Sequence, residues 1–307
     1  MAELASPLSS RTAAVLVVYR LKAPLEQVLE ALTRAVALTV VVDNSEHGHD
    51  SLVALVQRPG VVLLRGANRG ALAGAYNMAL THLRAHHTAT FEQIVFLDDD
   101  SDASLLGDLL GDQATALCLG KPDTAAVAPA YRDRATGLRG KYIELGRWRL
   151  VFMQREFSDL RRVAFVINSM SVWRWSALER IGPFSEDLAI DHVDTEYCLR
   201  ARSLGLKVYV HGGHVFAHSI GERRRFRFLG RDMQAGGHAP ARRFLIGRNT
   251  LWLARAWVWR EPAFAFLCLT RLAYEIAGIL LAEDCVSAKL AALLRGAAVG
   301  AVTSRRP

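Results

Sequence analysis

Short runs of apolar, often β-branched residues alternate with longer amphipathic segments over the first 130 residues. The runs expected to form strands are 14–19, 38–42, 61–64, 94–97 and 125–128. The segments expected to form helices between them are 25–35, 51–57, 71–86 and 105–118. Strands joined by helix-length connections are typical of parallel sheets that are covered by helices. The pattern therefore predicts an α/β fold with a mostly parallel central sheet flanked by helices.

The pattern changes after about residue 130. Extended pieces are expected around 141–145 and 162–172, a helix over 194–204, and a strand over 207–210 that leads to His218. From Arg223 onward the chain is basic and then mostly apolar and helical, with a break at Pro262. We therefore expect three parts: a flexible N-terminus over 1–11, a main domain over 12–222, and a C-terminal helical module over 223–307.

Composition supports a buried core and a reducing environment. The chain has 307 residues, of which 51% are hydrophobic, and this excludes disorder as the default. Its cysteines show neither CxxC spacing nor the density of a disulfide scaffold; they are Cys118, Cys198, Cys268 and Cys285. Residues 1–11 lack a cationic start followed by an apolar stretch, so no secretory signal is visible. The expected location is the cytoplasm.

Positive charge is concentrated near the C-terminal module. Residues 223–260 contain ten arginines, no lysine and one acid, Asp232. Aromatic residues interleave with the arginines in a helix-like pattern, which favours an anionic membrane surface over nucleic acid as partner, although an ordinary solvated helix face fits equally well. Residues 263–282 are apolar but interrupted by Arg271 and Glu275, so we expect a buried or interfacial helix and not a clean membrane span.

Three adjacent carboxylates, Asp98, Asp99 and Asp100, follow the apolar run 94–97. Acids at the carboxyl end of a parallel strand can hold a divalent cation beside a diphosphate. An Asp in this place can also cap the helix that follows, and the triplet alone does not decide between the two.

Two further strand ends carry polar groups that suit a nucleotide. Asp43 follows the second strand, where it could accept a hydrogen bond from a nucleobase or ribose, or simply form a turn. The third strand leads into residues 66–70, where glycines would let backbone amides approach a phosphate before a helix that carries Asn77. Ordinary glycine-rich turns look the same.

A second acidic cluster lies at a predicted helix start and contains Asp191, Asp194 and Glu196. One of these carboxylates could deprotonate an acceptor hydroxyl as a general base, whereas acids at helix starts also stabilise the helix through its dipole. His218 lies 24 residues after Asp194. A lone histidine is usually structural, but one directed at the aspartate triplet would complete a metal site.

In order and spacing these motifs resemble the inverting family-2 glycosyltransferases of GT-A fold, most closely the bacterial rhamnosyltransferases. The resemblance covers about residues 12–250 and is carried by the motifs above and by 181–200 and 218–221. It implies a GT-A (Rossmann-like) domain with a nucleotide-sugar half over about 12–130, an acceptor half over about 131–222, and a C-terminal helical appendage.

The resemblance also implies roles for individual residues. Those expected at the nucleotide sugar are Asp43, Asn68, Arg69, Gly70, Asn77, Asp98 and Asp99. Asp43 would hold the nucleobase, and Asp99 is the variable member of the triplet. Asp100 and His218 would bind Mg²⁺ or Mn²⁺. Asp194 would be the catalytic base, although an alignment on the paired acids would choose Asp191.

The implied reaction is a single displacement with inversion that moves L-rhamnose from dTDP-L-rhamnose to a hydroxyl of a lipid-linked bacterial cell-surface glycan or glycolipid. Another donor such as UDP-galactofuranose is the alternative. A sugar-phosphate nucleotidyltransferase is disfavoured, because no glycine signature follows the first strand in residues 19–24. The implied partners exclude nucleic acid and leave self-association open, and the enzyme would be cytoplasmic or peripheral on the inner face of the membrane.

Three segments add to these expectations. Residues 168–171 depart from the small-residue segment expected near the acceptor, which leaves acceptor identity open. Trp173 and Trp175 would share one side of a strand, where they could stack on a sugar or belong to the core. The arginines within 223–231 could form a mobile lid over the diphosphate.

Overall fold

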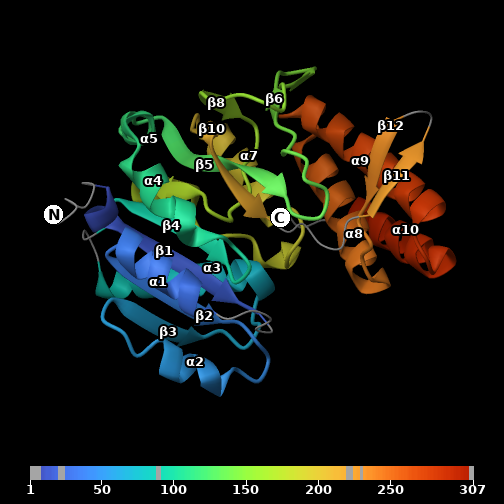
Figure 1. Cartoon of the computed structure of the whole chain (residues 1–307). Coiled ribbons are helices and arrows are strands. Elements are labelled where there is room, and N and C mark those ends of the chain that lie inside the picture. Colours follow the sequence, from blue (N-terminus) through green and yellow to red (C-terminus); the bar gives the residue numbers. More distant parts are fainter. Residues whose placement is uncertain (1–7, 20–24, 88–90, 219–223, 229–230, 304–307) are drawn as a thin grey trace. The chain divides into compact units, whose positions relative to one another are not determined.

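The computed structural model describes residues 8–19, 25–87, 91–218, 224–228 and 231–303 (Figure 1). Residues 1–7 of the predicted flexible N-terminus lie outside this part, as do parts of the predicted lid and residues 219–221 of the His218 motif. Within 8–11, Leu8 is buried and Ser9–Arg11 forms a short 3₁₀ helix.

The central sheet has eight strands in the order β3-β2-β1-β4-β9-β5-β10-β8. Their bounds are β1 (Thr12–Val18), β2 (Leu38–Asp43), β3 (Val61–Arg65), β4 (Gln93–Asp98), β5 (Thr124–Asp133), β8 (Leu160–Val163), β9 (Val172–Arg174) and β10 (Lys207–His218). Strands β3, β2, β1 and β4 run parallel to one another. Strand β9 is antiparallel to both β4 and β5, and β8 is antiparallel to β10. Every β1 residue is buried, as expected for a strand covered on both faces.

Helices cover the sheet in the order that the sequence predicts. They are α1 (Glu26–Ala35), α2 (Asp50–Leu55), α3 (Ala71–His86), α4 (Leu106–Gly111), α5 (Gln113–Leu119), α6 (Trp175–Ile181) and α7 (Val193–Ser203), with 3₁₀ turns η2 (Ala103–Leu105) and η3 (Glu186–Leu188). The single helix predicted over 105–118 is wrong. It is broken at Asp112, which is extended and caps α5 by accepting a 2.7 Å hydrogen bond from the Thr115 amide.

Two apolar layers lie against the sheet. One contains aliphatic residues of α1 and α4 against alternate residues of β1, such as Leu16. The other is aromatic: Tyr76 of α3 lies 4.7 Å from Phe96 of β4, and Phe184 stacks at 3.8 Å on Tyr197 of α7. This aromatic layer positions α3 and α7 beside the end of β4.

The two tryptophans differ in environment. Trp173 of β9 is fully buried and donates from Nε1 to the Ser171 hydroxyl, so it is a core residue. Trp175 begins α6 and does not continue the strand, so the assumption that both share one strand face is wrong.

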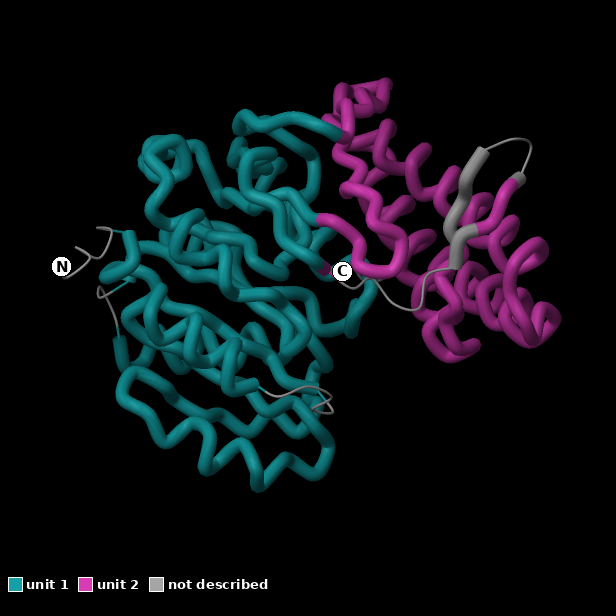
Figure 2. Tube along the Cα trace, in the orientation of Figure 1, with its two compact units in different colours: residues 1–131, 156–217 teal, residues 132–155, 218–307 magenta. Residues whose placement is uncertain are grey.

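The described chain separates into two compact units (Figure 2). The first contains residues 1–131 and 156–217, and the second contains 132–155 and 218–307. The segment 132–155, which the sequence placed with the acceptor half, contributes the hairpin β6 (Ile143–Leu145) and β7 (Leu150–Phe152) to the second unit. The predicted functional division of the chain stays a prediction.

The rest of the second unit is the predicted C-terminal appendage. It contains the hairpin β11 (Arg224–Phe228) and β12 (Arg231–Ala235), followed by α8 (Pro240–Trp257), α9 (Pro262–Ala282) and α10 (Val286–Val302). Before Pro240 the basic segment forms an antiparallel hairpin, in which 224–228 pair with 231–235, and the helix-like pattern of arginines and aromatic residues falls mostly on α8. Together with the mixed, mostly parallel sheet, these helices confirm the predicted α/β fold class with a mostly parallel central sheet flanked by helices and a C-terminal helical appendage.

Helices α8 and α10 pack backbone to backbone. A Cβ atom at Gly247, Gly296 or Gly300 would collide with carbonyl oxygens of the opposite helix, so only glycine permits this approach. The unit also contains a buried ion network. The side chain of Arg243 on α8 is fully buried and pairs with Glu275 of α9 and with Glu283, which also pairs with Lys289.

An 18-residue window of α9 has a mean hydropathy of 1.7, so by length and composition this helix could cross a membrane. The expectation that its two charges would exclude a span on these grounds is wrong. Only 28% of that apolar window is buried inside the described protein. Both interrupting charges have partners, because Glu275 pairs with Arg243 and lies 3.9 Å from Arg271.

Candidate functional site

The aspartate triplet lies in the turn that follows β4, in the first unit, and its three side chains are half-buried. The neighbouring Asp102, not the triplet, caps the next turn by accepting from the Ser104 amide at 3.1 Å and from its hydroxyl at 2.6 Å. The capping explanation for the triplet is therefore wrong. Asp99 instead accepts a hydrogen bond from the Tyr19 amide at 3.3 Å.

Asp98 is held beside Tyr76 and Asp194. The Tyr76 hydroxyl hydrogen-bonds the Asp98 carboxylate, and Asp194 of α7 is close enough to act electrostatically on both. Burial and the charges of Asp100, Asp194 and Asp99 raise the pKa of Asp98 to about 8. The triplet and the second acidic cluster, separated by more than 90 residues in the chain, therefore form one carboxylate site.

Asp194 accepts a hydrogen bond from the backbone amide of Asn168. Burial raises the pKa of Asp194 to about 6 despite this bond, and the nearby charge of Asp191 adds to the rise. Asp191 is itself buried, but it is not among the main influences on Asp98, whereas Asp194 is. Of the two candidate bases, Asp194 is the one coupled to the triplet.

The loop 168–171 forms a wall of this site. Met170 is buried with a left-handed φ of 65°, which a bulky residue rarely adopts. In this conformation Asn168 presents its amide to Asp194, and the Ser169 hydroxyl lies 2.6 Å from that of Ser101. Backbone strain of this kind costs roughly 1–3 kcal/mol and concentrates at functional sites.

Tyr76 and Asn168 are the site residues that sequence reasoning left without a role. Both lie in segments that drew attention for other reasons, the helix after residue 70 and the unusual stretch 168–171. A tyrosine facing an aromatic layer looks like a core residue in sequence, and its contact with Asp98 exists only in the folded chain.

Glu196 is part of the structural framework. Its side chain is buried and makes a bidentate pair with Arg200 at 2.7 and 2.9 Å, one helical turn away. Arg200 also donates to the Ile181 carbonyl at 3.0 Å. The pair anchors α7 and so fixes the position of Asp194.

Asp43 lies at the end of β2 and is fully buried. It accepts hydrogen bonds from the amides of His49 at 2.7 Å and Ser45 at 3.2 Å, and pairs with Arg65 at 2.9 Å. Burial alone would raise the pKa of Asp43, but the bonds from His49 and Ser45 outweigh it and lower the pKa. Its carboxylate thus orders the loop before α2, and its contact with a nucleobase stays a prediction.

The predicted phosphate loop joins β3 to α3. Asn68 and Gly70 adopt left-handed φ angles of 53° and 65°, and the Asn44 side chain ties the loop down by donating to the Ala71 carbonyl at 2.9 Å. Arg69 is exposed. None of these residues contacts the carboxylate site through a described bond, and their contact with a nucleotide sugar stays a prediction.

Asn77 is fully occupied by protein groups. Its amide donates to the Phe184 carbonyl at 3.0 Å and to Glu186 at 2.8 Å, and its oxygen accepts from the Phe184 amide at 2.8 Å. These bonds hold α3 against the turn before α7. Its predicted contact with the nucleotide sugar is untested.

His218 ends β10 and belongs to the second unit, whereas Asp100 belongs to the first. Its role as a metal ligand stays a prediction.

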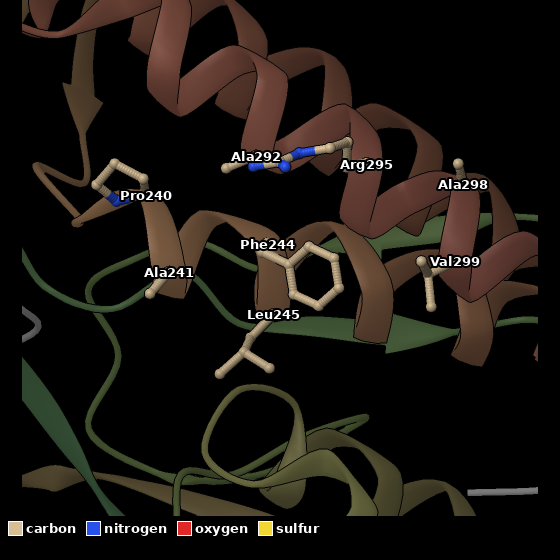
Figure 3. Close-up of a pocket in the computed structure, with 8 residues that line it drawn as sticks. All are labelled: Pro240, Ala241, Phe244, Leu245, Ala292, Arg295, Ala298 and Val299. Atoms are coloured by element: carbon tan, nitrogen blue, oxygen red, sulfur yellow. The ribbon is translucent and has the colours of Figure 1, made fainter.

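A groove of about 780 Å³ lies between α8 and α10 in the second unit (Figure 3). It is lined by Pro240, Ala241, Phe244, Leu245, Ala292, Arg295, Ala298 and Val299. Arg295 is the only charged residue in this lining.

Comparison with known proteins gives a partial match. No family model matches the chain. Over 89 residues the chain is 33% identical to the dTDP-rhamnosyl transferase RfbF of Shigella flexneri, which covers 29% of each protein. The chain thus matches less than a third of the length of this curated relative.

Among solved structures, the chain is similar to GalNAc-T7 with UDP, GalNAc and Mn²⁺, with a TM-score of 0.49 and 11% identity over 86% of this chain and 55% of that one. A likeness this distant says nothing about chemistry. The chain therefore has an α/β fold with a mixed, mostly parallel sheet, and part of it is similar in sequence to a protein named as a dTDP-rhamnosyl transferase.

Proposed function

We propose that the protein is a metal-dependent inverting glycosyltransferase that uses a nucleotide sugar. The observation that carries this proposal is the meeting of the Asp98–Asp100 triplet with Asp194 at the end of β4. A cluster of this kind can serve both halves of a displacement, because one set of carboxylates can face the leaving diphosphate while another accepts a proton.

The carboxylate site fits a divalent cation. Its donors are oxygens, which Mg²⁺ and Mn²⁺ prefer, and the pKa of Asp98, raised by burial and by neighbouring carboxylates, reflects negative charge that a cation would balance. The residues that would hold the ion are Asp100 with Asp98. When bound, the ion would neutralise charge on the departing nucleoside diphosphate.

Asp194 is suited to the role of general base. The pKa of Asp194 is about 6, so its carboxylate is mostly ionised at neutral pH. This pKa is also nearer to neutral pH than that of an ordinary aspartate, which favours proton transfer. The Asn168 amide orients its carboxylate. Asp194 would take the proton of the acceptor hydroxyl as that oxygen attacks the anomeric carbon from the face opposite the leaving group, which inverts the configuration.

The proposed donor is dTDP-L-rhamnose, and the proposed acceptor is a hydroxyl of a lipid-linked bacterial cell-surface glycan. The motifs of the sequence support this choice, as does the partial match to a protein named as a dTDP-rhamnosyl transferase. The test is transfer and hydrolysis across a panel of nucleotide sugars, with and without EDTA. Turnover of UDP-galactofuranose but not of dTDP-L-rhamnose would overturn the donor and leave the reaction type intact.

The base assignment has a sharper test in Asp194→Asn. We expect this variant to lose transfer while its affinity for the nucleotide, measured by calorimetry, stays within about twofold, because the base acts on the acceptor and not on the nucleotide. Asp108→Asn on the exposed side of α4 is the matched control and should behave like the wild type. Near wild-type turnover by Asp194→Asn would instead move the role to Asp191.

We further propose that the second unit binds the anionic inner face of the cytoplasmic membrane. Phe266, Leu269 and Leu280 of α9 are 60%, 55% and 53% exposed and share one helical face, and Trp259 is 93% exposed just before it. Exposed arginines of the same unit, among them Arg260, supply charge complementary to acidic lipids.

Sedimentation with vesicles tests this location. The protein should bind vesicles that contain an acidic phospholipid, bind purely zwitterionic vesicles more weakly, and lose binding in Leu269→Glu. Leu117→Glu, at an equally exposed leucine of the first unit, is the control and should bind normally. Failure of the wild type to bind either vesicle, together with self-association that Leu269→Glu abolishes, would assign the α9 face to a second copy of the chain.

A further inference from the structure

A separate cluster of ligating side chains lies in the first unit and has no part in the carboxylate site. Asp112 stands between α4 and α5, and His211 and His214 lie on β10. His211 Nε2 is 3.3 Å from Asp112 Oδ1, and His214 Nε2 is 3.9 Å from Asp112 Oδ2. One ligand atom from each residue lies within 4.8 Å of the others. The cluster joins the helical layer to a strand near the edge of the sheet.

The separations suit a small tetrahedral ion. Two ligands at zinc bond lengths are roughly 3.3 Å apart in a tetrahedral site. The His211–Asp112 pair already has this spacing, whereas the other separations, which reach up to 4.8 Å, must shorten by up to about 1.5 Å when an ion binds. The histidine rings lie 4.6 Å apart, edge to face, so both can direct a nitrogen at the same point.

The environment also favours a bound cation. The three side chains are largely withdrawn from water, with exposed fractions of 27% for Asp112, 10% for His211 and 18% for His214. Asp112 is held in place because its carboxylate also caps α5. Two imidazoles and one carboxylate are the ligands that zinc uses with a water in the fourth position, whereas Mg²⁺ prefers oxygen ligands alone.

One contact works against the ion. The Gly213 amide donates to His211 Nδ1 at 3.1 Å, which places the ring proton on Nε2, facing Asp112. Binding at Nε2 requires the other neutral tautomer, in which the ring proton has moved from Nε2 to Nδ1, so the Gly213 hydrogen bond is lost. Three metal bonds are gained in exchange for this one contact.

We propose that Asp112, His211 and His214 bind a Zn²⁺ ion that ties the α4–α5 turn to β10. The ion is structural in its effect, since it replaces a weak hydrogen-bonded cluster with a crosslink between residues about a hundred positions apart. The proposal is independent of the glycosyltransferase assignment, because it rests on none of the carboxylate-site residues.

The test is Co²⁺ and Zn²⁺ binding to the full-length protein after removal of metals, in the presence of excess Mg²⁺ to occupy oxygen-only sites. We expect one Co²⁺ per chain with the visible absorption of a tetrahedral complex, displaced by Zn²⁺. His214→Gln and Asp112→Asn should lose this complex. Asparagine keeps the α5 cap, and circular dichroism checks that both variants fold.

The matched control is His86→Gln, which removes an exposed histidine from the group at the end of α3 and should retain the complex. Zn²⁺ should also raise the melting temperature of the wild type but not that of His214→Gln. The proposal is overturned if the wild type forms no tetrahedral complex, if the complex survives in His214→Gln, or if it disappears in His86→Gln.

Discussion

The carboxylate site should make the metal-free protein less stable as pH rises. The perturbation that isolates this effect is Asp98→Asn, because asparagine has nearly the same shape and can still accept a hydrogen bond from Tyr76. The variant removes one ionisable group from a site where burial and three neighbouring carboxylates oppose its charge.

The size of the effect follows from the pKa of Asp98, which rises from 3.8 to about 8. The interval from the ordinary aspartate pKa of 3.8 to pH 7 is 3.2 pH units. Over this interval the folded protein loses up to about 4 kcal/mol of its free energy of unfolding. The sign is fixed by proton binding. Between about pH 4 and pH 8 the folded state keeps a proton that the unfolded chain has lost, so stability is present at low pH and declines through this window.

The assay is urea denaturation of both proteins in EDTA at several pH values. Asp98→Asn should be more stable than the wild type by a few kcal/mol at pH 8, and the difference should nearly vanish at pH 4. Added Mg²⁺ should stabilise the wild type more than the variant, because a cation offsets the same repulsion. Asp108→Asn, which changes an exposed aspartate in the same way, should show none of this.

Two results would refute the reasoning. Equal stability of Asp98→Asn and the wild type at pH 8 would mean that the carboxylate is not opposed by its surroundings. A difference that stays constant from pH 4 to pH 8 would mean that the substitution acts through packing and not through charge.

Other predictions concern the framework. Gly70→Ala should destabilise the protein by about 1–3 kcal/mol in urea denaturation, since the residue has a left-handed φ of 65° and a Cβ atom would meet the Glu186 carboxylate; an unchanged midpoint would contradict this. Arg243→Leu should cost about 3–5 kcal/mol, because it leaves the buried Glu283 and the partly buried Glu275 without their main cation. A loss below about 1 kcal/mol would show that this network contributes little.

The sequence by itself determined the α/β class and the approximate place of most strands and helices in the first unit. Hydrophobic periodicity is a local property: β2 to β5 contain the apolar runs that predicted them, such as Ile94–Leu97 within β4, and β1 ends one residue before the predicted run 14–19 does. It also identified the aspartates after β4 and at the start of α7, because acids that interrupt apolar segments are visible without a fold.

Only the tertiary structure decided what each polar group does. Asp102 caps the helix, Glu196 pairs with Arg200, and Asn77 binds the turn at Phe184, so their partners in the folded chain separate these residues from Asp98 and Asp194. The grouping of Asp112 with two distant histidines was equally invisible. Such assignments depend on contacts between segments far apart in the chain, which packing of the sheet and its helices creates and local sequence patterns do not encode.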